Sequence, residues 1–128
     1  MQIKAFITSL EDWAPIQFQE SYDNAGLIVG DPEANCTGVL CSLDCTEAVV
    51  EEAIEKGCNL IVSHHPIIFK GIKQFSSDHY VNRTVLKAIQ NNIALYAIHT
   101  NLDNVIHGVN STLADRLHLE NRKILAPI

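Results

Sequence analysis

The chain has 128 residues, of which 47% are hydrophobic and 19% charged, and its formal net charge is −6 at pH 7. This length and balance are typical of one globular domain with a substantial core. The nine Lys and Arg residues are scattered along the chain, which argues against bulk binding to nucleic acid or to an acidic membrane, because neutralising phosphates needs a clustered basic excess. No apolar run approaches the ~20 residues that a membrane-spanning helix needs.

The four cysteines form no C-x-x-C pair, and they are Cys36, Cys41, Cys45 and Cys58. No signal peptide precedes them, so we expect a cytoplasmic location and reduced thiols. Cys41 and Cys45 can be considered as a metal pair, but Cys41 lies within a strand pattern, which favours a small core residue instead. Beyond packing, the sequence assigns the cysteines no role.

In chain order, the first predicted elements build one βαβ unit. Apolar spacing predicts a helix at 2–10, and a short strand at 27–30 follows a turn-forming segment. The mostly apolar run at 38–43 predicts a strand buried on both faces. Thr46 can cap the next helix and Gly57 can end it. A second buried strand at 59–63 should run parallel to the first.

The alternation of strands and helices continues to the end of the chain. It predicts a helix at 80–91, a buried strand at 93–98 and another helix that begins over 110–117. Such alternation is typical of an α/β fold with a mainly parallel sheet, βαβ units and helices on its faces. We therefore expect residues 1–128 to form a single α/β domain.

Polar residues directly follow two of the predicted strands. The strand at 59–63 runs into His64-His65-Pro66, and the strand at 93–98 runs into residues 99–104, HTNLDN. Because ligands bind beyond the carboxyl ends of parallel strands, His64, His65 and Asp103 are expected to converge there. Imidazole and carboxylate are the usual ligands of zinc, iron and manganese. Ordinary loop histidines are the competing interpretation, which the arrival of Asp103 at the same edge disfavours.

The adjacent histidines suggest more than one ion. Neighbouring side chains on extended backbone point to opposite sides, and Pro66 favours that conformation at His65. Such a pair chelates one ion poorly but can serve two neighbouring ions. Asp103 can then complete one ion or bridge both.

Five further residues are candidates for supporting roles in the site. Asp44 follows the first buried strand and so lies at the same edge. For His99, a substrate contact or a hydrogen bond to a ligand is favoured over direct ligation. Lys70 and Lys73 can face an anionic substrate, although solvated loop lysines fit equally well. Asn104 completes this group of candidate contacts.

Three segments resemble the NIF-three-like family, whose bacterial members are called GTP cyclohydrolase 1 type 2 homologues: Tyr22–Gly30, Ser63–Pro66 with Phe69, and His99–Asp103. The resemblance implies the N-terminal half of such a protein, with His64 and His65 as ligands to different ions and Asp103 as a ligand to one. Family members add a His and a Glu from a C-terminal H-x-x-x-E segment, which this sequence lacks. A fragment of a longer two-domain protein is therefore expected.

The resemblance also implies two divalent cations and a homohexameric ring. The sequence then favours a metal-dependent hydrolase that acts on a nucleotide or another small phosphorylated substrate, with no residue assigned as catalytic. The alternative is a metal-binding regulatory or scaffolding protein that acts through protein contacts in the ring. A plain α/β domain without metal is the third interpretation.

Overall fold

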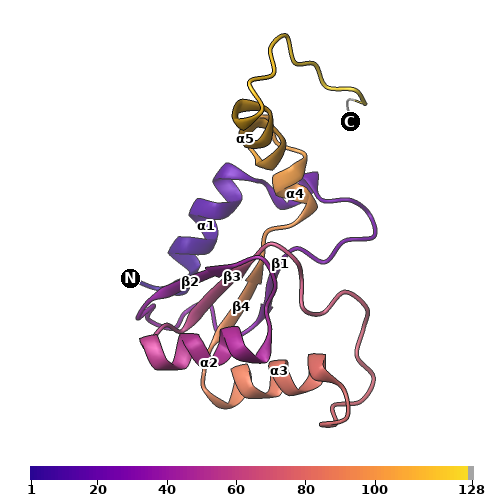
Figure 1. Cartoon of the computed structure of the whole chain (residues 1–128). Coiled ribbons are helices and arrows are strands. Elements are labelled where there is room, and N and C mark those ends of the chain that lie inside the picture. The colour runs from indigo at the N-terminus through magenta and orange to yellow at the C-terminus, as the bar shows by residue number, and fades with distance from the viewer. Residues whose placement is uncertain (127–128) are drawn as a thin grey trace.

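The computed structural model describes residues 1–126, which are built around a 4-stranded sheet with the order β1-β4-β3-β2 (Figure 1). Strands β2, β3 and β4 run parallel, whereas β1 pairs with β4 in the antiparallel direction. The strands are β1 (Gly26–Val29), β2 (Val39–Ser42), β3 (Leu60–Ser63) and β4 (Ala94–Ala97). The prediction of an α/β fold with a mainly parallel sheet is confirmed.

Helices cover both faces of this sheet. Helix α1 lies on one face, and α2 and α3 lie side by side on the other (Figure 1). The predicted helices are all present, and the first of them continues to Trp13. The helical elements are α1 (Ile3–Trp13), the 3-10 turn η1 (Ile16–Phe18), α2 (Glu47–Lys56), α3 (Tyr80–Gln90), α4 (Thr100–Asp103) and α5 (Val109–Arg116).

Local signals define the helix that connects β2 to β3. The Thr46 side chain accepts a hydrogen bond from the backbone N–H of Val49 and so caps α2. At the other end, Gly57 adopts a left-handed conformation with φ +68° that ends the helix. The sequence alone therefore fixes both ends of this crossover, which directs β3 back alongside β2.

The two central strands are buried on both faces. Every residue of β3 and β4 is buried. Leu60 and Tyr96 pack with Ile3 of α1 on one face, while Ile61 and Leu95 pack against α2 and α3 on the other. Because both faces are close-packed, the carboxyl ends of these strands have little freedom to move.

Strand β2 lies at the edge of the sheet, so the prediction that it is buried on both faces is wrong. Cys41 pairs in register with Val62 but is exposed, and Val39 is also exposed. The cluster under α1 draws its strand residues from β1, β3 and β4, and leaves this face of β2 open. Leu40, on the other face, packs against the core cluster that contains Val50 and Ala53 of α2. The expectation that Cys41 is a core residue is wrong for the same reason, whereas Cys45 is buried.

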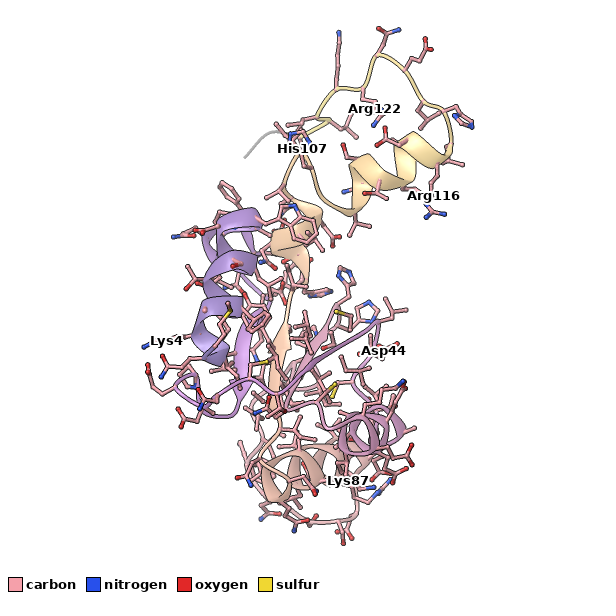
Figure 2. All side chains as sticks on the ribbon, turned by 90° about the vertical axis from the view of Figure 1, so that its left-hand side faces the viewer. Lys4, Asp44, Lys87, His107, Arg116 and Arg122 are labelled. Carbon is pink, nitrogen blue, oxygen red and sulfur yellow. The ribbon has the colours of Figure 1, made fainter. Side chains whose placement is uncertain are left out.

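The C-terminal part of the described chain extends away from the sheet. Figures 1 and 2 show α5 beyond α4, with Arg116 and Arg122 on the outlying part. Helix α5 contains no buried residue, and its apolar side chains Val109 and Leu113 are exposed. None of the helices in residues 1–126 has the length and apolar character needed to cross a membrane.

Candidate metal centre

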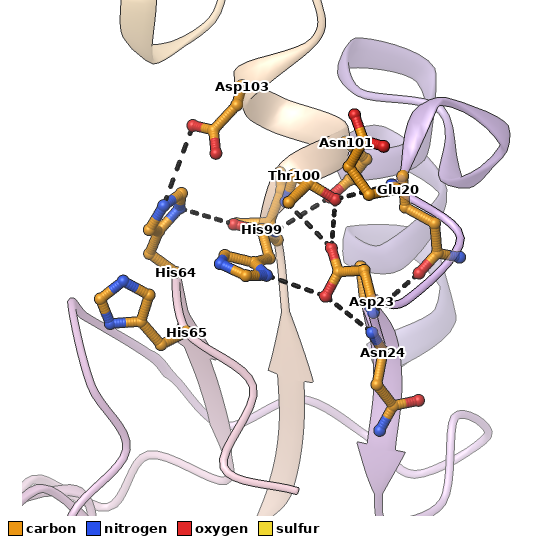
Figure 3. Close-up of polar contacts among 12 residues, drawn as sticks. Glu20, Asp23, Asn24, His64, His65, His99, Thr100, Asn101 and Asp103 are labelled. Carbon is orange, nitrogen blue, oxygen red and sulfur yellow. Dashed lines mark hydrogen bonds and ion pairs between the residues drawn. The ribbon is translucent and has the colours of Figure 1, made fainter. Parts of the chain in front are cut away.

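Three imidazoles meet at the carboxyl ends of the two central strands. His64 and His65 directly follow β3, and His99 follows β4 after one residue. One ring nitrogen from each lies within 4.8 Å of the other two (Figure 3). We call these residues the imidazole cluster. Their ring centroids are 5.0 to 5.6 Å apart.

The rings of His64 and His65 lie on the same side of the chain, so the expectation that they point to opposite sides is wrong. The backbone bends at these two residues instead of staying extended. The Ser63 hydroxyl donates a hydrogen bond to the carbonyl of His65 at 2.9 Å, which holds the bend. The pair can therefore present its nitrogens to one common space.

A backbone carbonyl fixes the tautomer of His64. Its Nδ1 lies 2.9 Å from the carbonyl oxygen of Ile98, which can only accept a hydrogen bond. Nδ1 must therefore carry the proton, and Nε2 of the neutral ring keeps its lone pair. That Nε2 lies 3.9 Å from Oδ1 of Asp103 (Figure 3).

Carboxylates anchor the other two rings in the same way. Nδ1 of His65 lies 2.7 Å from Oδ1 of Asp44, and Nδ1 of His99 lies 2.8 Å from Oδ1 of Asp23. A hydrogen bond at Nδ1 that leaves Nε2 available is the usual arrangement of metal-ligating histidines. The residues therefore fit a divalent cation. The sequence favoured a supporting role for His99. In the structure, its ring has a partner at Nδ1 and a nitrogen within 4.8 Å of one on each of the other two rings, as theirs do, so it is an equal candidate for direct ligation.

Asp23 is the feature that sequence reasoning missed. Its side chain is fully covered, and it accepts hydrogen bonds from the His99 ring, from the N–H and hydroxyl of Thr100, and from the N–H of Asn24. Burial raises the pKa of Asp23, but these hydrogen bonds outweigh it and hold the pKa below its usual value. A buried carboxylate whose ionised form is favoured by these hydrogen bonds therefore orients His99. The sequence signal that could have identified Asp23 is its position in the Tyr22–Gly30 segment, one of the three that resemble the family.

The short helix α4 places Asp103 beside the cluster. Asn101 is fully buried, donates from Nδ2 to the carbonyl of Ala14 at 2.7 Å, and accepts at Oδ1 from the N–H of His99 at 2.9 Å. This double contact fixes the turn between His99 and Asp103, which is why a residue four positions beyond His99 comes within 3.9 Å of His64. Of the expected convergence, the structure shows the approach of Asp103 to His64 and of His64 to His65.

Three of the candidate supporting residues have no hydrogen bond to the cluster within residues 1–126. Asn104 donates from Nδ2 to the carbonyl of Phe18 at 2.9 Å, so it ties α4 to η1. Lys70 and Lys73 are exposed in the segment between β3 and α3. Within residues 1–126, neither lysine makes a hydrogen bond or ion pair with the imidazole cluster, and their contact with an anionic substrate stays a prediction.

Fold and site together define an α/β protein with a candidate metal centre on the carboxyl edge of its sheet. The sequence model of the Duf34/NIF3 family (NGG1p interacting factor 3) matches residues 1–128, and the chain belongs to this family. A Clostridium acetobutylicum relative named GTP cyclohydrolase 1 type 2 homolog is 43% identical over 126 residues, which cover 98% of this chain and 47% of the relative. A Staphylococcus aureus relative of the same name is 48% identical, with 98% and 34% covered.

Solved structures of relatives share the fold. A Bacillus cereus protein related to NIF3 superposes with a TM-score of 0.94 at 39% identity, over 100% of this chain and 36% of that one. Staphylococcus aureus protein SA1388 gives a TM-score of 0.91 at 48% identity, over 98% and 36%. The chain spans between a third and a half of the length of the curated relatives cited above.

Proposed function

We propose that the chain is the metal-binding part of a metal-dependent hydrolase that acts on a nucleotide or another small phosphorylated substrate. The observation that carries this proposal is the imidazole cluster, in which every Nδ1 is held by a carbonyl or a carboxylate and every Nε2 is left available. His64, His65 and Asp103 are the proposed ligands, and the geometry adds His99 to them. A chance group of loop histidines would not be expected to have a partner at Nδ1 in all three rings.

The chemistry of these donors suits divalent cations of the zinc, iron or manganese type, two of them in the complete site, because these metals accept imidazole and carboxylate together. When bound, such a pair supplies Lewis acidity at a carbonyl or phosphoryl oxygen and promotes the ionisation of water. The acidic side chains Asp23, Asp44 and Asp103 surround the rings, and their combined negative potential attracts cations.

The protein's own residues orient the ligands. Two buried groups, the Asp23 carboxylate and the carbonyl of Ile98, hold the rings of His99 and His64, and the exposed Asp44 holds His65. These contacts fix which nitrogen of each ring is deprotonated before a metal binds. The site is thereby preorganised, which lowers the cost of assembling it around an ion.

We further propose that the complete site needs residues from beyond this chain. The relatives are two to three times as long, and a group of three imidazoles with one nearby aspartate is a sparse set for two ions. The 1–128 segment would then be one α/β domain of a two-domain protein that assembles as a ring. Light scattering of the complete gene product measures that assembly.

The test of the enzymatic proposal is metal titration into the complete gene product, followed by assays on nucleotides and simple phosphoesters. We expect metal-dependent turnover that disappears in the His64→Ala and His65→Ala variants. Tight metal binding with no turnover of any of these compounds would contradict the hydrolase assignment but support the metal site.

A regulatory or scaffolding role is the second candidate. The exposed apolar side chains of α5 favour it, because apolar groups gathered on an open surface often mark protein contacts. In the double variant His64→Ala/His65→Ala, persistence of the assembly after loss of metal would separate scaffolding from catalysis. Loss of the assembly as well would make the metal structural.

A further inference from the structure

Two exposed aromatic side chains stand beside the imidazole cluster. Tyr22 is 64% exposed and Phe69 is 46% exposed, although both are large apolar groups. Their ring centroids are 6.3 Å apart, and the Phe69 ring meets the ring of His99 edge-on, also at 6.3 Å. We call Tyr22 and Phe69 the aromatic pair. Through Phe69, the pair adjoins His99 of the cluster.

The aromatic pair is held in place by the residues next to it in sequence. Tyr22 is followed by Asp23, which binds His99 and Thr100, and by Asn24, whose Nδ2 donates to the carbonyl of Ile68 at 2.7 Å. Ile68 directly precedes Phe69. The loop before β1 and the loop after β3 are thus tied together at this point, so hydrogen bonds hold the backbone that carries the two aromatic rings.

An exposed and positioned aromatic pair has a chemical preference. Aromatic faces bind other flat rings by stacking or edge-on contact, and they do so with any nucleobase because every base has a π face. The pair offers no positive charge to a phosphate. A substrate with a flat ring at one end and a polar reacting group at the other would match the pair and the imidazole cluster respectively.

We propose that Tyr22 and Phe69 form a subsite for the aromatic or heteroaromatic ring of the substrate, of the nucleobase class, adjoining the metal centre. This inference rests on the proposed function, since it names the part of the substrate that the metal-dependent site would hold in place. The subsite selects which phosphorylated compounds bind productively. The reacting group itself is bound at the cluster.

The experiment compares guanosine 5′-monophosphate with ribose 5-phosphate, which lacks the base, by calorimetry on the metal-loaded complete gene product. We expect the nucleotide to bind about 10-fold more tightly, as one stacked base contributes. Phe69→Leu and Tyr22→Leu should each reduce that advantage, while the affinity for ribose 5-phosphate stays unchanged. Phe75→Leu and Tyr80→Leu, at aromatic residues that are 52% and 54% exposed, are the matched controls and should change neither affinity.

Upfield shifts of the base protons in the NMR spectrum of the bound nucleotide provide a second measurement, because they report stacking directly. Equal affinity for both compounds, failure of both to bind, or an advantage that survives both leucine substitutions would each overturn the subsite. Metal content is measured on the same samples. A protein that retains its metal but shows no preference for the base refutes the subsite alone, whereas a protein that binds no metal refutes the proposed function.

Discussion

The central strands β3 and β4 and the edge strand β2 end at the same side of the sheet, but they differ in how deeply they are buried. β3 and β4 are buried along their whole length and lead into His64, His65 and His99. β2 has one open face and leads into Asp44, whose side chain is 58% exposed. The comparison teaches that the buried central strands position the candidate imidazole ligands, while the edge strand positions a solvent-exposed carboxylate.

The largest expected effect concerns stability. Leu60→Ala, in β3, should lower the free energy of unfolding by about 2–5 kcal/mol, because it opens a cavity in a fully packed core. Val39→Ala, in β2, should cost at most about 1 kcal/mol, because that side chain already meets water. Urea unfolding followed by circular dichroism measures both. Similar losses for the two variants would mean that β2 is covered in solution.

Metal affinity should depend most on the residues after the central strands. His64→Ala should weaken zinc binding by more than about 100-fold, since removal of a direct ligand exceeds the effect of removing an outer partner. Competition with a chromophoric chelator gives the affinity. His107→Ala, at an exposed histidine outside the cluster, is the control and should leave it unchanged. Unaltered affinity in the His64 variant would end the case for this ligand set.

The two carboxylates that hold the rings should differ in importance. Asp23→Asn should weaken metal binding by about 10- to 100-fold, because the buried carboxylate that orients His99 is lost. Asp44→Asn should cost less than about 10-fold, because its pair with His65 is exposed to solvent and screened. Nitrogen-15 NMR of the imidazoles should show a change of tautomer at His99 only in the Asp23 variant. A larger loss for Asp44→Asn would reverse the comparison.

The smallest expected effect is a difference in thiol reactivity between Cys41 and Cys45. Burial raises the pKa of the Cys45 thiol to about 11, so at pH 8 only about one molecule in a thousand carries the reactive thiolate. Cys41 is exposed and should react with iodoacetamide first, as mass spectrometry of the labelled peptides would show.

Because the unfolded thiol ionises at lower pH than the folded one, the contribution of Cys45 to stability falls as the pH rises towards 11. Rapid labelling of Cys45 at pH 8 would contradict its burial.

Much of this protein follows from its sequence, because the responsible signals are local. Periodicity placed the helices and strands, Thr46 and Gly57 marked the ends of α2, and the alternation of elements indicated the parallel sheet. That alternation also brought His64 and Asp103 to one edge, since parallel strands share the side on which they end.

Only the tertiary structure decided the rest, because it depends on contacts between segments far apart in the chain. The strand order puts β2 at the edge, and the cluster under α1 does not extend to it, which leaves Cys41 exposed. A hydrogen bond from Ser63 bends the chain, so that His64 and His65 face one space instead of two. Asp23 meets His99 across 76 positions of sequence, a pairing that no local pattern encodes.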